Sequence, residues 1–184
     1  MDEIDPLQAR RRHIVAVCAD VFLRYGYART TMGDIAQAAG LSRPTLYAAF
    51  ADKEAVFAAV IHHLVQVNLA DIRQGLARHR SVARKLRYAC TAWGVAGFEL
   101  VRANPESKDV FDLSFPAVRQ SHEVFEAFLV ELLSPHWPAD GPPLPGIAHM
   151  VGAAIKGFKA LAQTSDELRQ MIEDLTDLVA GQTI

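Results

Sequence analysis

The 184 residues of this chain are enough for one ordinary hydrophobic core, or for a small domain joined to a larger one. Hydrophobic residues make up 51% and charged residues 22% of the sequence, a soluble globular balance that excludes an intrinsically disordered chain. The net charge of −2 excludes a polycation, but residues 7–53 hold seven Lys or Arg against three Asp, a local charge of +4. A basic segment in an otherwise acidic chain suits a protein that presents one end to phosphate groups.

The first two helices are predicted from apolar spacing and from residues that begin and end helices. Apolar residues recur at intervals of three and four after Pro6, and Gly26 is the expected end of the first helix. Thr31 and Asp34 have the spacing of a capping box at the start of a second, short helix. Gly40 is expected to close that helix.

A third short helix and a long fourth helix are predicted next. Ser42 is suited to cap the third helix, with Pro44 in its first turn, where a missing N–H costs little. Asp52 is expected to cap the fourth helix. The tight turn between the second and third helices leaves the third standing clear, where it can enter a DNA major groove.

The rest of the chain also predicts helices joined by loops. Amphipathic helices are expected over 81–103, 118–132, 146–163 and 166–180, a short helical piece over 108–113, and a proline-rich loop over 134–146. No segment shows the strict alternation of a half-buried strand. We therefore predict an all-α fold.

The N-terminal third of the chain resembles the TetR family of transcriptional regulators. The resemblance rests on a long, ordered set of residues: Phe22, Gly26, Thr30, Thr31, Ile35, Ala36, Ala39, Gly40, Leu41, Ser42, Thr45, Leu46, Tyr47, Phe50, Lys53 and Glu54. It implies about nine helices in two domains. Residues 1–52 would form a three-helix helix-turn-helix DNA-binding head, and residues 53–184 a helical ligand-binding and dimerisation body.

The outer side of the third helix carries the expected DNA contacts. The fork of Arg43 matches the two acceptors of guanine, Pro44 is suited to touch a thymine methyl, and Thr45 is expected to point to the groove. The resemblance implies phosphate contacts for Tyr47 and Lys53. An ordinary core position is the alternative for Tyr47.

Further contacts are expected beside that helix. Thr31 and the N–H groups that begin the second helix predict a phosphate site, and Ser42 is grouped with the DNA-binding residues as the cap of the third helix. The arginines at 10–12 are interpreted either as a basic arm that reaches phosphate or as a solvated helix face. Gly33 departs from the family pattern, which often has a larger or polar side chain there. We therefore expect fewer base contacts from the second helix.

The last two helices are expected to form the dimer surface, because one head touches too little DNA for useful selectivity. The resemblance implies a four-helix bundle with a second copy. The expected interface residues are Ile155, Phe158, Leu168, Met171, Leu175 and Leu178. The alternative is that these apolar residues face only their own core.

The resemblance further implies an inducer cavity within the middle helices. The expected lining residues are Trp93, Phe98, Phe111, Phe115, His122, Phe125 and Met150. Glu99, Arg102 and His122 are candidates to fix a polar group of the ligand. Each aromatic taken singly is better explained as part of an ordinary core, so the ligand hypothesis rests on the family and not on these residues.

Other chemistry is not indicated. Cys18 and Cys90 lie far apart without metal-type spacing, which predicts free thiols in a reducing compartment. We expect no signal sequence, no apolar run near the roughly 20 residues of a membrane span, no metal or cofactor site and no enzyme activity.

The sequence thus predicts a cytoplasmic, ligand-responsive regulator, most simply a repressor, that binds a palindromic operator as a dimer and is released by a small-molecule inducer. Two alternatives stay open. One is a helical ligand-binding or interaction protein with impaired DNA binding, and the other is a metal- or redox-sensing regulator.

Overall fold

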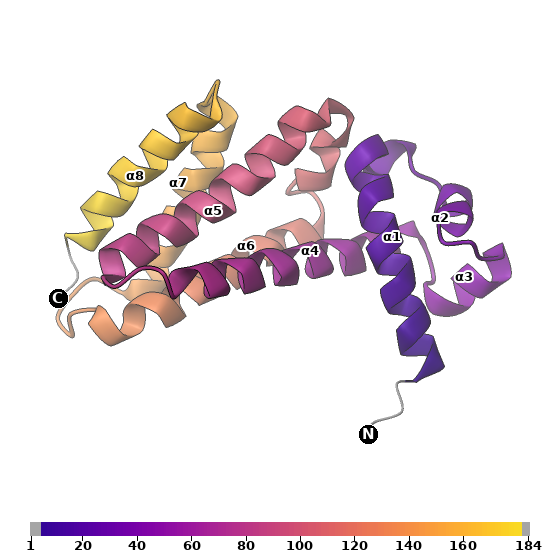
Figure 1. Ribbon diagram of the computed structural model, residues 1–184, viewed down its shortest axis with the longest axis horizontal. Helices are drawn as coiled ribbons and strands as arrows, with labels where there is room; N and C mark the ends of the chain where they lie inside the picture. Colours follow the sequence, from indigo (N-terminus) through magenta and orange to yellow (C-terminus); the bar gives the residue numbers. More distant parts are fainter. Residues whose placement is uncertain (1–4, 182–184) are drawn as a thin grey trace. The chain divides into compact units, whose positions relative to one another are not determined.

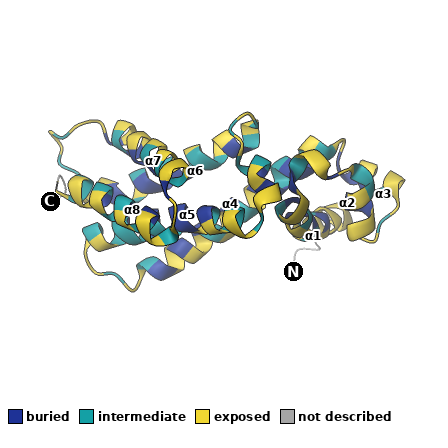
Figure 2. Cartoon of the chain, turned by 90° about the horizontal axis from the view of Figure 1, so that it is seen from above, coloured by how far each residue is buried: buried dark blue, intermediate teal, exposed yellow. Residues whose placement is uncertain are grey.

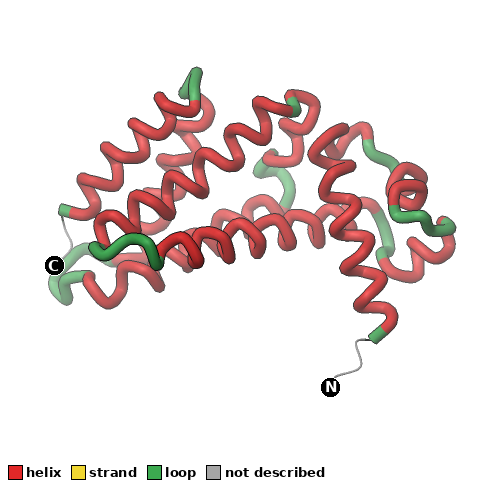
Figure 3. Tube along the Cα trace, in the orientation of Figure 1, coloured by secondary structure: helices red, strands yellow, loops and turns green. Residues whose placement is uncertain are grey.

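The computed structural model describes residues 5–181, and within this range it contains helices and loops without a strand (Figures 1 and 3). The elements are α1 (Pro6–Arg29), α2 (Met32–Ala38), α3 (Arg43–Ala49), α4 (Lys53–Leu76), α5 (Val82–Ala103), the 3-10 helix η1 (Pro105–Phe111), α6 (Pro116–Leu133), the 3-10 helix η2 (Ser134–His136), α7 (Leu144–Leu161) and α8 (Ser165–Ala180). The predicted all-α fold is confirmed. Residues 1–4, on which the expectation of no signal sequence partly rests, lie outside the described residues.

By its internal contacts the chain forms two compact units. The first contains residues 1–66 and 101–119, and the second contains residues 67–100 and 120–184, so α4 passes through both. These packing units do not follow the functional division expected at residues 52 and 53, because η1 packs with the N-terminal helices. The functional boundary itself stays a prediction.

The first unit has a core of apolar side chains from α1 to α4. Its fully or nearly fully buried members include Ile14, Cys18, Phe22, Ile35, Leu46, Phe50, Val56, Phe57 and Val60. Since the apolar positions of α1, α2 and α3 meet in this one core, these three helices pack together as a single body.

A break in α1 is completed by η1. Gly26 has φ 78° and ψ 169°, a conformation open to glycine and almost no other residue, and its carbonyl accepts a hydrogen bond from the Thr30 hydroxyl at 2.7 Å. The Asp109 carboxylate then accepts hydrogen bonds from the N–H groups of Tyr27 at 2.9 Å and Ala28 at 2.8 Å. Backbone donors freed by the break thus find a charged acceptor, which makes these bonds strong ones.

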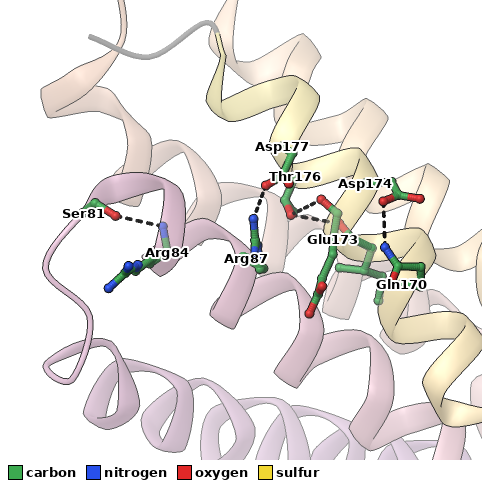
Figure 4. Close-up of polar contacts among 9 residues, drawn as sticks. Ser81, Arg84, Arg87, Gln170, Glu173, Asp174, Thr176 and Asp177 are labelled. Carbon is green, nitrogen blue, oxygen red and sulfur yellow. Dashed lines mark hydrogen bonds and ion pairs between the residues drawn. The ribbon is translucent and has the colours of Figure 1, made fainter.

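In the second unit α5 packs closely on α7 and α8. A Cβ added to Gly94 would lie 2.6 Å from Ile172 Cδ1 and 3.1 Å from Ile155 Cγ2, so a larger residue here would have to displace these side chains. Arg87 on α5 forms an ion pair with Asp177 on α8, as the close-up in Figure 4 shows. The terminal helix is therefore tied to the core of its unit by both packing and charge.

Some element boundaries differ from the predictions. The helical piece expected at 108–113 is the 3-10 helix Pro105–Phe111, and α7 begins at Leu144, two residues earlier than expected. In both cases a proline stands in the first turn, where its missing N–H needs no partner. The proline-rich loop also contains the short helix η2.

The expectation that no apolar run approaches a membrane span needs correction at α4. This 24-residue helix is long and apolar enough by length and composition, with a mean hydropathy of 1.5 over its best window. A core helix of a soluble protein passes the same test. Here α4 buries Phe57 and Val60 in the first unit and Leu69 and Ile72 in the second.

Candidate nucleic-acid interface

Two seven-residue helices, α2 and α3, are joined by a tight turn at Gly40. Gly40 has φ +64°, in the left-handed region, and the N–H of Leu41 donates to the carbonyl of Ala36 at 2.9 Å. At the start of α2 both halves of the predicted capping box between Thr31 and Asp34 are present. The local signals of the sequence therefore position this helix pair as expected.

Apolar residues beneath the two helices fix their crossing. Ile35, Ala36, Ala39, Leu46 and Phe50 are all buried, and Leu41 is half-buried. Because two of these are alanines, α2 and α3 lie close against the core, and the opposite side of α3 is left to solvent.

The solvent side of α3 carries two of the predicted base-reading residues, Arg43 and Pro44, together with Tyr47, for which a phosphate contact is predicted. Arg43, Pro44 and Tyr47 are exposed, and Figure 2 shows this outer helix largely in the exposed colour. The side chain of Tyr47 is 51% exposed, so the alternative that it is a core aromatic is wrong. Thr45 is half-buried, and its hydroxyl lies 2.7 Å from the hydroxyl of Ser42.

The hydroxyls assigned to this surface are already engaged in capping. The Thr31 hydroxyl donates to Asp34 Oδ2 at 2.7 Å, and Ser42 Oγ accepts the N–H of Thr45 at 3.3 Å. The hydroxyl and the N–H of Thr31 hold the pKa of Asp34 below its ordinary value, and the nearby charge of Arg43 lowers it further. Thr31 and Ser42 thus shape the helix starts, and DNA contacts from them remain predictions.

The Lys53 side chain contacts α1. This half-buried side chain donates from Nζ to the carbonyl of Tyr27 at 2.8 Å and lies 4.1 Å from the centre of the Tyr27 ring. The same ring packs on Phe57 at 4.9 Å and on Phe115 at 4.6 Å between centroids. A phosphate contact by Lys53 stays a prediction, and the ammonium group has two N–H donors besides the one that donates to the Tyr27 carbonyl.

The arginines at 10–12 lie within α1 rather than in a separate arm, which corrects the expected geometry. All three are exposed, and the guanidinium of Arg11 lies 4.7 Å from the centre of the Phe50 ring, at the end of α3. His13 Nε2, for which no sequence pattern indicated a role, lies 3.2 Å from the carbonyl of Ala39. These contacts place the start of α1 beside the helix-turn-helix.

Sequence reasoning missed the contribution of η1 to the head. Besides the Asp109 carboxylate at the end of α1, Glu106 forms an ion pair with Arg29. The partners are about 80 residues apart in the chain, so no spacing pattern could have joined them. The one local signal was Gly26, whose conformational freedom marks a place where another part of the backbone can approach.

Three of the seven residues predicted to bind a ligand come together in the second unit. The rings of Trp93 and Phe125 are stacked at 4.4 Å with an interplanar angle of 4°, and His122 lies edge-on to Trp93 at 6.3 Å. Burial lowers the pKa of His122 to about 4, and the positive charges of Lys159 and Lys156 act in the same direction. This cluster keeps its imidazole neutral at physiological pH.

The other four predicted ligand residues lie elsewhere. Phe98 is buried on α5, Phe111 is half-buried in η1, and Phe115 belongs to the aromatic cluster of the first unit. Met150 is 59% exposed on α7. Phe111 and Phe115 thus belong to the first unit, and the aromatic cluster of the second unit contains three of the seven. A hollow of about 550 Å³ lies instead over α1 and α2, and none of the seven contributes to it.

The predicted dimer residues divide by burial. Ile155 and Leu168 are 1% and 0% exposed, so they belong to the core of their own unit. For these two residues the alternative interpretation, that they face only their own core, agrees with their burial. Phe158, Met171 and Leu175 are half-buried on α7 and α8. Leu178 on α8 is 75% exposed. Among the six, these last four are available to a second molecule.

A strip of small and apolar residues follows the exposed face of α7. Met150, Ala153, Gly157 and Leu161 succeed one another at helical spacing, and all four are exposed. A Cβ added to Gly157 would meet nothing within 4 Å. A neighbouring helix could therefore approach α7 closely along this strip.

The two cysteines are buried and unpaired with each other. Burial raises the pKa of the Cys18 thiol to about 11 and also raises that of Cys90. Little thiolate forms at neutral pH on such groups, so their reactivity is low. Within residues 5–181, no group of three or more His, Cys, Asp or Glu side chains is placed to hold a metal ion.

The helix-turn-helix has counterparts among known proteins. Residues 14–60 match the family model of bacterial regulatory proteins of the tetR family. Over 88 residues the chain is 32% identical to the HTH-type transcriptional activator FasR of Mycolicibacterium smegmatis. This match covers 48% of this chain and 40% of FasR. Over 56 residues it is 41% identical to the HTH-type transcriptional repressor Rv1474c of Mycobacterium tuberculosis, 30% of each protein. The chain thus spans less than half the length of these curated relatives.

Solved structures share the whole fold. A TetR-family transcriptional regulator from Cytophaga hutchinsonii superposes with a TM-score of 0.74 at 19% identity, over 100% of this chain and 99% of that one. The regulator FadR from Bacillus subtilis, solved in complex with stearoyl-CoA, superposes with a TM-score of 0.63 at 15% identity, over 91% and 96% of the two chains. At these identities the likeness extends to the fold.

Proposed function

Since this chain is a TetR-family transcriptional regulator, we propose that it acts as a homodimeric repressor that binds a palindromic operator and is released by a small-molecule inducer. The observation that carries the proposal is the outer face of α3, which presents Arg43, Pro44 and Tyr47 to solvent above a fully packed support. Of the two curated relatives, one is named an activator and the other a repressor. Repression is proposed because it is the commoner role in the family.

In this proposal α3 enters the major groove. Arg43 donates to the two acceptors of a guanine, and Pro44 touches a thymine methyl. Tyr47 and Lys53 contact phosphates on either side of the groove, and Thr31 at the start of α2 contacts a further phosphate. The first group selects the sequence, and the second contributes affinity that all duplexes share.

Dimerisation is proposed through α7 and α8. Support comes from the exposed strip on α7 and from Leu178, with the half-buried Phe158, Met171 and Leu175 beside them. A two-fold pair places one α3 in each of two successive major grooves, which is why the operator is expected to be palindromic. The protein is proposed to work in the cytoplasm and to use no cofactor.

The inducer is proposed to bind in the body near Trp93, His122 and Phe125, where aromatic surface and a neutral imidazole adjoin two lysines. Its binding would favour a conformation whose heads no longer fit successive grooves. Because FadR was solved with stearoyl-CoA, a ligand screen should begin with long-chain acyl thioesters. A rise in Tm and loss of operator binding at the same ligand concentration would support this role.

The alternatives have less support. The alternative of an interaction protein with impaired DNA binding does not explain why Arg43 and Tyr47 are exposed on α3. A redox sensor would require a reactive thiolate, whereas burial raises the pKa of both cysteines. Operator affinity measured with zinc, copper or an oxidant separates these regulators from an inducer-released one.

The proposal is tested by selecting duplexes from a random-sequence pool and comparing the parent with Arg43→Ala. The variant should lose discrimination by about 1–3 kcal/mol for each altered base contact, as measured by fluorescence anisotropy on selected and mutated duplexes. Arg12→Ala removes the same charge from an exposed site on α1 and is the matched control, which should weaken all sequences alike. If Arg43→Ala selects the same sequence as the parent, the assignment of the site is wrong.

A further inference from the structure

The side chain of Arg43 fills the space that a larger residue at position 33 would occupy. Arg43 begins α3, but its guanidinium lies against the start of α2. A Cβ added to Gly33 would lie 2.7 Å from Arg43 Nη2 and 3.6 Å from Arg43 Cζ. Since a Cβ does not stand within 3.0 Å of another heavy atom, any side chain at position 33 must displace this guanidinium.

Glycine is required here for space and not for backbone conformation. Among the glycines of residues 5–181, only Gly26 and Gly40 have positive φ values, so the backbone at Gly33 would accept an ordinary residue. An L-residue at position 33 would even favour the helix, because glycine lowers helix stability by about 0.5–1 kcal/mol. The cost of keeping glycine in α2 therefore needs another explanation, and the position of Arg43 supplies one.

Asp34 gives the guanidinium a reason to rest on α2. Its Oδ2 atom accepts hydrogen bonds from the N–H of Thr31 at 2.9 Å and from the Thr31 hydroxyl at 2.7 Å, so the carboxylate has a fixed place. Its negative charge and the positive charge of Arg43 attract each other across Gly33. This attraction and the room at Gly33 both favour the position of the Arg43 guanidinium beside α2.

We infer that Gly33 is a specificity-determining residue: by leaving room for Arg43, it directs the guanidinium to a base pair at the edge of the half-site that faces α2. This rests on the proposed function, in which Arg43 reads a base. Arg43 on α3 thus makes the base contact that a larger side chain at position 33 on α2 would otherwise make. Placing a side chain at position 33 changes the preference at that one base pair in each half-site and leaves the other positions as they are.

The test is a double-mutant cycle of Gly33→Ala and Arg43→Ala on the full-length protein. Each variant is measured against the operator selected by the parent and against duplexes that carry one altered base pair, by fluorescence anisotropy. Gly33→Ala should lower discrimination at the base pair read by Arg43 by about threefold or more, and should change nothing in the Arg43→Ala background. Gly146→Ala, at an exposed glycine whose added Cβ meets nothing within 4 Å, is the matched control.

The outcomes separate this inference from the proposed function. If Arg43→Ala discriminates like the parent, the proposed function fails at its central residue. If Arg43→Ala loses discrimination while Gly33→Ala keeps it, only the inference is overturned. An equal effect of Gly33→Ala in both backgrounds overturns it as well, because position 33 would then act without Arg43. The Tm of Gly33→Ala should not fall, and a lowered Tm would show that packing other than Arg43 limits this position.

Discussion

Replacing Gly26 by alanine should destabilise the first unit more than any ordinary single substitution. With φ 78° and ψ 169°, the backbone occupies a region that costs a residue with a side chain about 1–3 kcal/mol. The added Cβ would also overlap the carbonyl oxygen of Glu106 and lie 2.7 Å from Asp109 Oδ1. A carbonyl of the main chain cannot rotate aside as a side chain does, so η1 itself must move away from α1.

That movement has its own cost. It lengthens the hydrogen bonds by which the N–H groups of Tyr27 and Ala28 reach the Asp109 carboxylate, now 2.9 and 2.8 Å long. A hydrogen bond to a charged group contributes about 1.5–3 kcal/mol, and losing one of the two is enough to double the backbone cost. The free energy of unfolding should fall by about 2.5–6 kcal/mol in total, at or beyond the upper end of the usual range of about 0.5–3 kcal/mol for single substitutions.

Urea denaturation followed by far-UV circular dichroism measures this loss. Both tryptophans, Trp93 and Trp137, lie in the second unit, so their fluorescence should shift less than the helical signal if the units unfold separately. Gly146→Ala is the control, since Gly146 is exposed, its added Cβ would meet nothing within 4 Å, and its change should stay within about 1 kcal/mol. A loss below about 1 kcal/mol for Gly26→Ala would refute the reasoning, because strain at this φ alone predicts that much.

Three further changes test other parts of the molecule. Lys53→Ala should weaken binding to all duplexes about equally and lower the salt slope of log K by about one unit in anisotropy titrations, and a sequence-selective loss would contradict a phosphate role. Leu175→Ala combined with Leu178→Ala should give monomers in sedimentation velocity, whereas an unchanged dimer would remove α8 from the interface. Burial lowers the pKa of His122 from 6.5 in the unfolded chain to about 4 in the folded protein. Between these two pH values the unfolded chain therefore binds more protons than the folded one, and the free energy of unfolding falls as the pH drops through that window. His122→Gln should flatten this dependence by about 1–3 kcal/mol in urea titrations from pH 7 to pH 4, with the exposed His62→Gln as the control; equal slopes for both variants would contradict it.

The helix starts of the head could be predicted because their interactions are local. A capping box such as Thr31 with Asp34 joins residues three apart, and Ser42 bonds the N–H of Thr45 at the same separation. Gly40 likewise marks its turn by a conformation that few other residues adopt. For such contacts the sequence order is already the spatial order, so spacing and residue type together identify them.

Contacts between distant segments could not be predicted in the same way. Phe115 and Trp93 are both aromatic residues at apolar positions, yet one packs on Tyr27 of the head and the other stacks on Phe125 of the body. Composition does not distinguish a pocket lining from a core, because both bury the same kind of surface. The same limit applied to Lys53, whose bond to the Tyr27 carbonyl depends on where α1 ends relative to α4.

The DNA-binding unit is built from two separate stretches of chain, and this changes what its sequence must contain. Residues 14–60 match the family model, but the break at Gly26 is completed by Asp109 from outside that range. A head that ended at residue 52 would leave the N–H groups of Tyr27 and Ala28 to water and would lose the packing of Phe115 on Tyr27. The position of α1, and with it the support beneath α2 and α3, thus depends on a segment that the helix-turn-helix pattern does not include. A residue with a side chain at position 26 therefore fits only where Glu106 and Asp109 of η1 lie farther from α1.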